Sequence, residues 1–156
     1  MVSKFPTLFA TLLLMAGCAE QSLESGTADE ARSMLTRAVA AVRADQDAAI
    51  IAFNKGDDGF LDRDLYPFCI QSSDGMIVAQ GGPLSDVYLG RNMRELTDAV
   101  GKAYGEEMFQ AAQKPEGEIS EVSYMFPRPI ENSDPVDKTS FIQRVGDLAC
   151  GVGFYQ

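Results

Sequence analysis

The chain has 156 residues, of which 46% are hydrophobic and 9% aromatic, and this is typical of one globular domain with a single core. Its formal net charge of −10 opposes binding to phosphate backbones, so we expect no nucleic acid partner. The absence of histidine excludes a Ser-His-Asp triad, a Cys-His pair and any histidine metal site. No nucleophile stands beside a base either, so we expect a protein that is not an enzyme and has no cofactor and no metal site.

The N-terminus predicts a signal peptide at residues 1–17. The apolar run from Phe5 to Gly17 is too short to cross a hydrocarbon core of ~30 Å. The stretch "LLLMAGC" resembles the lipobox of bacterial lipoproteins, because small residues directly precede Cys18. This resemblance implies that Cys18 carries a lipid anchor, and Ala19 after it favours the outer membrane. The alternative is ordinary signal-peptide cleavage nearby, with Cys18 discarded.

Residues 18–26 are polar and aperiodic and predict a tether, which leaves residues 27–156 as the domain. Thr27 and Glu30 form a capping-box pattern, and a long amphipathic helix is expected to run from there to Gly56. The acidic loop "DDGFLDRD" follows and lacks the EF-hand pattern, so we expect a solvated loop, with weak calcium binding as the alternative. The apolar positions that define the helix are Ala31, Met34, Leu35, Ala38, Val39, Val42, Ala49, Ile50 and Phe53.

The rest of the chain predicts five strands and a helical connection. Asp74-Gly75 is a hairpin signal, whereas "GGPLSDVYLG" is too rich in turn residues to be regular. This order predicts an α/β (α+β) fold, a five-stranded antiparallel sheet with a long helix on one face. The expected strands are 65–71, 76–80, 119–126, 139–145 and 148–155, and the expected helical segments are 93–97 and 102–113.

Two cysteines remain when Cys18 is assigned to the lipid, and thiols in an exported, oxidising compartment tend to pair. If the first and last strands are antiparallel neighbours with Cys69 opposite Cys150, then Phe68 faces Gly151 and large residues meet small ones along one face. This complementarity predicts a Cys69–Cys150 disulfide. The alternative is two separate buried thiols, which behave as small hydrophobic groups.

Five sequence segments, taken in chain order, resemble the single-Cache type of Cache domain, which is an extracytoplasmic relative of the PAS fold. They are "DLYPFCIQSSDGMIVAQ", "LGRNMRELTDAVGK", "VSYMFPRPI", "DKTSFIQRV" and "LACGVGFY". The resemblance implies the sheet order 2-1-5-4-3, with short helices roofing the face opposite the long helix. It also implies a ligand on that roofed face, because Cache domains of chemoreceptors, histidine kinases and cyclases bind small extracellular molecules there.

The Gly146-Asp147 turn predicts that Lys138 pairs with Tyr155 in the last hairpin, on the face that glycines keep open. Cations and hydroxyls on this face can bind an anion. The alternative is that the aromatic residues belong to the core and that the cations are solvated. The predicted ligand-binding residues are Tyr66, Phe68, Tyr124, Lys138, Ser140, Arg144 and Tyr155.

Two classes of function remain. The first is a lipid-anchored periplasmic module that binds a small organic anion, such as a short carboxylate, and acts through a membrane sensor kinase, a chemoreceptor or a transporter. The second is a protein-interaction or scaffold lipoprotein whose Cache fold no longer binds a ligand. Both place the protein in the periplasm with its lipid anchor in a membrane.

Overall fold

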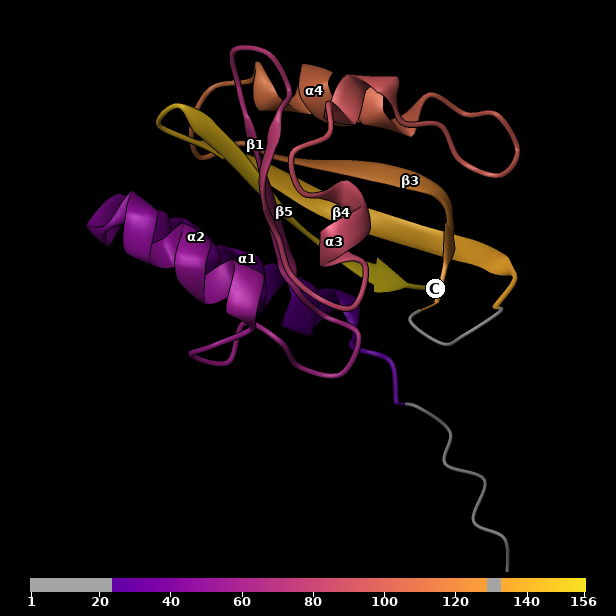
Figure 1. Ribbon diagram of the computed structural model, residues 1–156, viewed down its shortest axis with the longest axis horizontal. Helices are drawn as coiled ribbons and strands as arrows, with labels where there is room; N and C mark the ends of the chain where they lie inside the picture. The colour runs from indigo at the N-terminus through magenta and orange to yellow at the C-terminus, as the bar shows by residue number, and fades with distance from the viewer. Residues whose placement is uncertain (1–23, 129–132) are drawn as a thin grey trace, which may run out of the picture.

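The computed structural model describes residues 24–128 and 133–156. The predicted signal peptide, Cys18 and most of the tether lie outside the described residues. The described residues form a five-stranded antiparallel sheet in the order β2-β1-β5-β4-β3, with helices on both faces (Figure 1). This confirms the expected fold class and sheet order. The strands are β1 (Pro67–Gln71), β2 (Ile77–Gln80), β3 (Ile119–Pro127), β4 (Pro135–Val145) and β5 (Leu148–Tyr155).

The expected long helix is divided into two, α1 (Ala28–Ala44) and α2 (Gln46–Lys55). The predicted capping box at Thr27 and Glu30 is present, and Gly56 ends α2 in the left-handed conformation. The break lies at Asp45, whose backbone is extended and whose carboxylate accepts a hydrogen bond from the backbone N–H of Ala48. An aspartate makes this N-cap bond more readily than it continues a helix, so the prediction of one uninterrupted helix is wrong at this residue.

Three short helical elements cover the opposite face of the sheet: α3 (Ser85–Tyr88), the 3-10 helix η1 (Met93–Glu95) and α4 (Tyr104–Ala112). The last two confirm the predicted helical connection with shorter bounds. The single turn of α3 forms in a stretch that was expected to be irregular. Figure 1 shows α1 and α2 on one side of the sheet and α4 on the other.

Strand β5 is the central strand and pairs with both β1 and β4. Its bounds are those predicted, and the expected pairs Cys69 with Cys150 and Phe68 with Gly151 are both present. On the other side, Lys138 pairs with Tyr155 as predicted from the turn. A disulfide joins Cys69 to Cys150, which confirms the predicted bridge.

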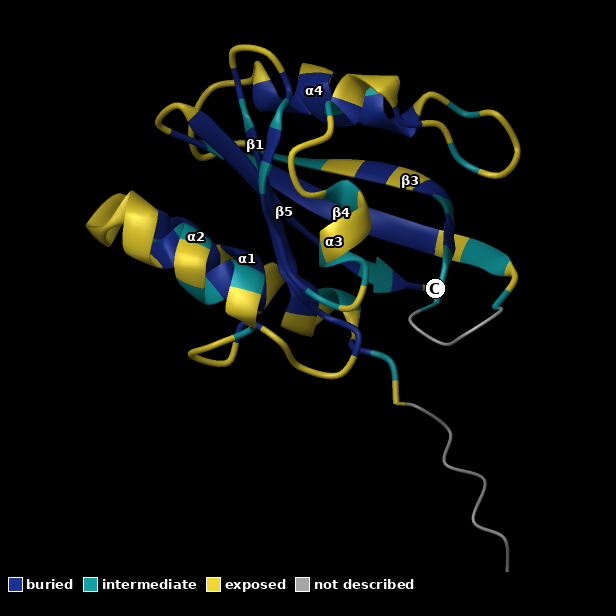
Figure 2. Cartoon of the chain, in the orientation of Figure 1, coloured by how far each residue is buried: buried dark blue, intermediate teal, exposed yellow. Residues whose placement is uncertain are grey.

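The sheet separates two hydrophobic cores. One core lies under α1 and α2 and includes the disulfide, and the other lies under α3, η1 and α4 and contains most of the aromatic residues. Successive residues of β5 point into opposite cores, because side chains alternate along a strand. Figure 2 shows β5 buried along nearly its whole length and β4 buried through its middle, whereas β3 at the sheet edge alternates between buried residues and intermediate or exposed ones.

The end of the expected tether contacts the domain. The backbone N–H of Gly26 donates to the buried carboxylate of Asp64 at 2.6 Å, and Arg128 donates to the hydroxyl of Ser25. A Cβ at Gly26 would lie 2.2 Å from Leu65, so only glycine allows this close approach. The domain therefore fixes the chain two residues before the helix cap at Thr27.

The disulfide should contribute strongly to stability, because it closes a long loop. The two cysteines are separated by 81 residues, for which the chain-entropy relation gives about 4.5 kcal/mol as an upper value. We expect the Cys69→Ala/Cys150→Ala variant to lose several kcal/mol of unfolding free energy, measured by urea denaturation of the isolated domain. Reductant should destabilise the wild-type domain and leave the double variant unchanged. Equal midpoints with and without reductant in the wild type would contradict this expectation.

Candidate functional site

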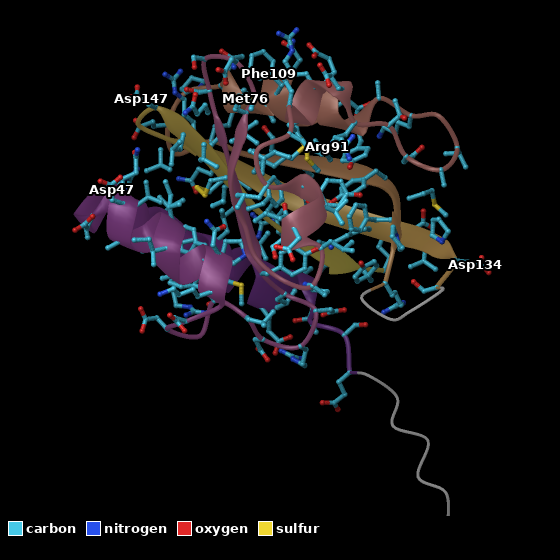
Figure 3. All side chains as sticks on the ribbon, viewed as in Figure 1. Asp47, Met76, Arg91, Phe109, Asp134 and Asp147 are labelled. Atoms are coloured by element: carbon cyan, nitrogen blue, oxygen red, sulfur yellow. A yellow bond between two sulfur atoms is a disulfide. The ribbon has the colours of Figure 1, made fainter. Side chains whose placement is uncertain are left out.

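The candidate site lies at one end of β4 on the face roofed by the short helices. Asp134 and Asp147, labelled in Figure 3, mark the two ends of this strand. Lys138 lies near the Asp134 end and Arg144 near the Asp147 end. Their side chains share one face of the sheet but stand far apart along the strand.

Lys138 is buried, with 2% of its surface exposed. Its ammonium donates a hydrogen bond to the hydroxyl of Tyr66 at 3.2 Å. Three aromatic rings surround the ammonium, with centroids at 4.8 Å (Tyr66), 4.9 Å (Phe126) and 4.5 Å (Tyr155). These rings offer cation–π attraction but carry no formal charge. No carboxylate in ranges 24–128 and 133–156 lies within 4.0 Å of this ammonium.

The burial of Lys138 changes its protonation. Desolvation lowers the pKa of the Lys138 ammonium to about 7, and the charge of Asp64 opposes this shift only in part. Burial also raises the pKa of the Tyr66 hydroxyl, so this neighbour stays neutral. The site therefore presents an amine that is charged only in part near neutral pH, beside neutral hydroxyls.

Lys138 forms part of the wall of a small cavity between the sheet and its roof. The cavity offers about 30 Å³ of space for the centres of water-sized molecules. Since one ordered water occupies roughly 10–15 Å³ on this measure, the space suits about two waters or a group of similar size. Its lining is formed by Tyr66, Phe68, Ile77, Gln80, Tyr88, Met93, Leu96, Tyr104, Met108, Tyr124, Phe126, Lys138 and Gly153.

Four of the seven predicted ligand-binding residues line this cavity, namely Tyr66, Phe68, Tyr124 and Lys138. Tyr124 stacks on Tyr104 with the ring centroids 4.4 Å apart, so the side wall is tied to α4. The three aromatic residues of this set are buried in the core and also border the cavity.

The other three predicted residues have different positions. The hydroxyl of Tyr155 donates to the carbonyl oxygen of Pro127 at 2.6 Å, so only its ring faces Lys138. The hydroxyl of Ser140 bonds that of Tyr124 at 2.9 Å and fixes the orientation of this cavity wall. Arg144 donates to the carbonyl oxygen of Gly146 and lies outside the cavity lining. Tyr155 and Ser140 therefore contact Lys138 and Tyr124 of the cavity wall, but they are not part of its lining.

Sequence reasoning missed the roof of the cavity. Tyr88 belongs to α3, Tyr104 to α4, and Gln80 ends β2. The exposed Arg91, labelled in Figure 3, lies over the ring of Tyr88, with its guanidinium carbon 5.8 Å from the ring centroid. The aromatic residues of the helical connection were a usable signal, because that connection was already expected to cover the ligand face.

Residues 24–128 and 133–156 hold no cluster of three or more Cys, Asp and Glu side chains placed to bind a metal ion. The residues of the acidic loop form turns, and its Arg63 bonds the carboxylates of Glu30 and Asp62. None of the helices in these ranges combines the length and the apolar character that a bilayer crossing requires.

The lowered pKa of Lys138 should make stability depend on pH. Between about pH 7 and pH 10 the unfolded chain keeps the lysine proton and the folded chain has released it, so the free energy of unfolding rises with pH, by at most about 1.4 kcal/mol per pH unit. We expect Lys138→Met to remove this rise and to be more stable than wild type at pH 7, because it buries no charge. Urea midpoints at pH 7 and 9.5 measure both effects.

Arg144→Met is the matched control, because it removes a cation from the same face of the same strand outside the cavity. It should retain the rise in stability with pH. A flat wild-type profile over this range, or a rise that persists in Lys138→Met, would show that this amine is not the group responsible.

Comparison with known proteins shows what the fold resembles. No protein-family model and no curated protein sequence matches the chain. Three solved structures superimpose on 81% of it. A methyl-accepting chemotaxis protein from Vibrio parahaemolyticus has a TM-score of 0.63 at 19% identity over 86% of its length. A periplasmic sensor domain of a chemotaxis protein has a TM-score of 0.56 at 20% identity over 88% of its length. A Cache chemosensory domain described as recognising carboxylic acids has a TM-score of 0.56 at 21% identity over 86% of its length. This chain has the Cache fold, the PAS-like architecture of such sensor domains.

Proposed function

We propose that this protein is a sensor module that binds a small organic anion, such as a short carboxylate, in the cavity beside Lys138. The observation that carries the proposal is the buried ammonium, which has a tyrosine hydroxyl as its hydrogen-bond partner and aromatic rings as its other neighbours. A buried charge is costly unless it is paired, and an anion in the cavity would supply the missing pairing.

Charge and size limit the ligand class. The other cavity residues are neutral, so the site matches one negative charge rather than two. The small space favours an anion of a few non-hydrogen atoms, such as acetate, and a longer acid would have to displace the roof. The fold-level likeness to a domain described as recognising carboxylic acids agrees with this ligand class.

The periplasmic location and the partner are part of the same proposal. Similar structures belong to chemotaxis proteins, one of them described as a periplasmic sensor domain. The expected lipid anchor at Cys18 would hold the domain at a membrane surface, where a sensor kinase, a chemoreceptor or a transporter could read its bound state. The ligand-free scaffold is the second candidate, and the small size of the cavity is the observation that favours it.

Ligand binding can be tested by thermal shift and calorimetry with formate, acetate, propionate and butyrate. A ligand at a hundredfold excess over its Kd should stabilise the domain by about 2.7 kcal/mol. We expect Lys138→Met to weaken binding roughly ten- to a hundredfold, because a hydrogen bond to a charged group is worth roughly 1.5–3 kcal/mol. At pH 8, binding should take up as much as about one proton, seen as a dependence of the measured heat on the buffer.

Arg144→Met again serves as the control and should bind with wild-type affinity. A panel without any stabilisation would favour the scaffold function. Equal affinities of wild type and Lys138→Met, with both folded, would place the anion elsewhere.

The lipid anchor has its own test. We expect the full-length protein to fractionate with membranes and Cys18→Ser to appear in the soluble periplasmic fraction, because loss of the thiol removes the site of acylation. Fractionation in the bacterial host followed by detection of both forms makes the comparison. The same distribution for both forms would contradict lipidation at this residue.

A further inference from the structure

The amine of Lys138 has the environment of a nucleophile as well as that of a counter-ion. It reaches the cavity wall across Gly153, where a Cβ would lie 2.6 Å from the lysine Cε. Its Nζ is 3.2 Å from the hydroxyl of Tyr66, and aromatic rings exclude most water around it. A small electrophile in the cavity would therefore meet the nitrogen directly.

The protonation of this amine favours nucleophilic attack. With its pKa lowered to about 7, roughly half of the Lys138 amines are neutral at pH 7, against roughly one in a few thousand for an ordinary lysine. The charged and titratable groups around it are Asp64, whose charge favours the protonated form, and tyrosines that burial keeps neutral. These tyrosines are Tyr66, Tyr104, Tyr124 and Tyr155.

We propose that Lys138 forms a reversible imine with short aldehydes of two or three carbons that enter this cavity. The reaction goes beyond anion binding and does not depend on it, because an aldehyde is uncharged and needs no counter-ion. The neutral amine selects a carbonyl compound, and the size of the cavity limits its length, since the space suits only a few non-hydrogen atoms.

The chemistry balances with the groups present. The Nζ lone pair attacks the carbonyl carbon, the carbonyl oxygen takes up a proton, and the nitrogen loses one, which gives a carbinolamine. Loss of one water molecule then forms the C=N bond. The hydroxyl of Tyr66 is placed to pass a proton between nitrogen and oxygen, because it already accepts a hydrogen bond from Nζ. The rings of Tyr66, Phe126 and Tyr155 would stabilise the protonated imine by cation–π attraction.

The test is reductive trapping of the isolated domain with acetaldehyde and cyanoborohydride at pH 7. The reductant delivers hydride to the imine carbon and converts the reversible adduct into a stable N-ethyl lysine. Peptide mass spectrometry over a time course then measures the labelling rate of each lysine. Lys55, Lys102 and Lys114 are more exposed than Lys138 and serve as controls within the same sample.

We expect Lys138 to be labelled at least about tenfold faster than each control lysine, a margin that allows for slow entry into a buried site. Tyr66→Phe should slow labelling of Lys138 and leave the control lysines unchanged, whereas Arg144→Met should have no effect. Labelling of the control lysines with Lys138 unmodified or slower would overturn the proposal, because access or basicity would then differ from those inferred here.

Failure of this proposal can be distinguished from failure of anion binding. Calorimetry with acetate measures the anion without any covalent step, so either result can be positive alone. If both occur at Lys138, acetate at saturating concentration should protect this lysine from labelling and leave the other lysines unprotected. Labelling of Lys138 at an unchanged rate in saturating acetate would separate the two sites.

Discussion

The register of β5 against its two neighbours is the constraint on which the rest of the structure depends. This strand is paired with β1 on one side and β4 on the other, and its alternate residues enter opposite cores. Cys150 therefore points into the core under α1 and α2, whereas Gly151 and Gly153 face the cavity on the other side of the sheet. A slip by one residue would exchange these faces and remove both the disulfide and the space for Lys138.

The buried ammonium and the disulfide act on stability in opposite directions. The disulfide restricts the unfolded chain, while desolvation of Lys138 disfavours the charged folded state near neutral pH. Because the disulfide stabilises the domain, the domain can tolerate a destabilising buried amine in the core under α3, η1 and α4. Side chains whose pKa is shifted by burial occur often in functional sites. The lowered pKa of Lys138 therefore points to a functional site more strongly than the burial of the aromatic residues around it does.

The bounds of β5, its pairing and the position of Lys138 could be predicted, because a two-residue turn and the two-residue period of a strand fix which side chains face one another. The break at Asp45 could not be predicted from periodicity, because the apolar stripe continues past it while a local cap decides the backbone. The aromatic residues of the helical connection signalled a cover for the ligand face. Which of them border the cavity, and the hydrogen bond from Tyr155 to Pro127, depend on how α3, α4 and the end of β3 pack against the sheet. No short-range pattern encodes that packing.

Gly153 gives the site a signature that a search for charged residues would overlook. Its missing side chain leaves the path along which the lysine stem crosses the neighbouring strand, and a Cβ there would also lie 2.7 Å from the hydroxyl of Ser140. Alanine at this position would displace the amine even with the lysine retained. In other sequences of this fold, a lysine on the fourth strand is therefore comparable to Lys138 only when glycine stands on the fifth strand two residues before the residue that pairs with that lysine.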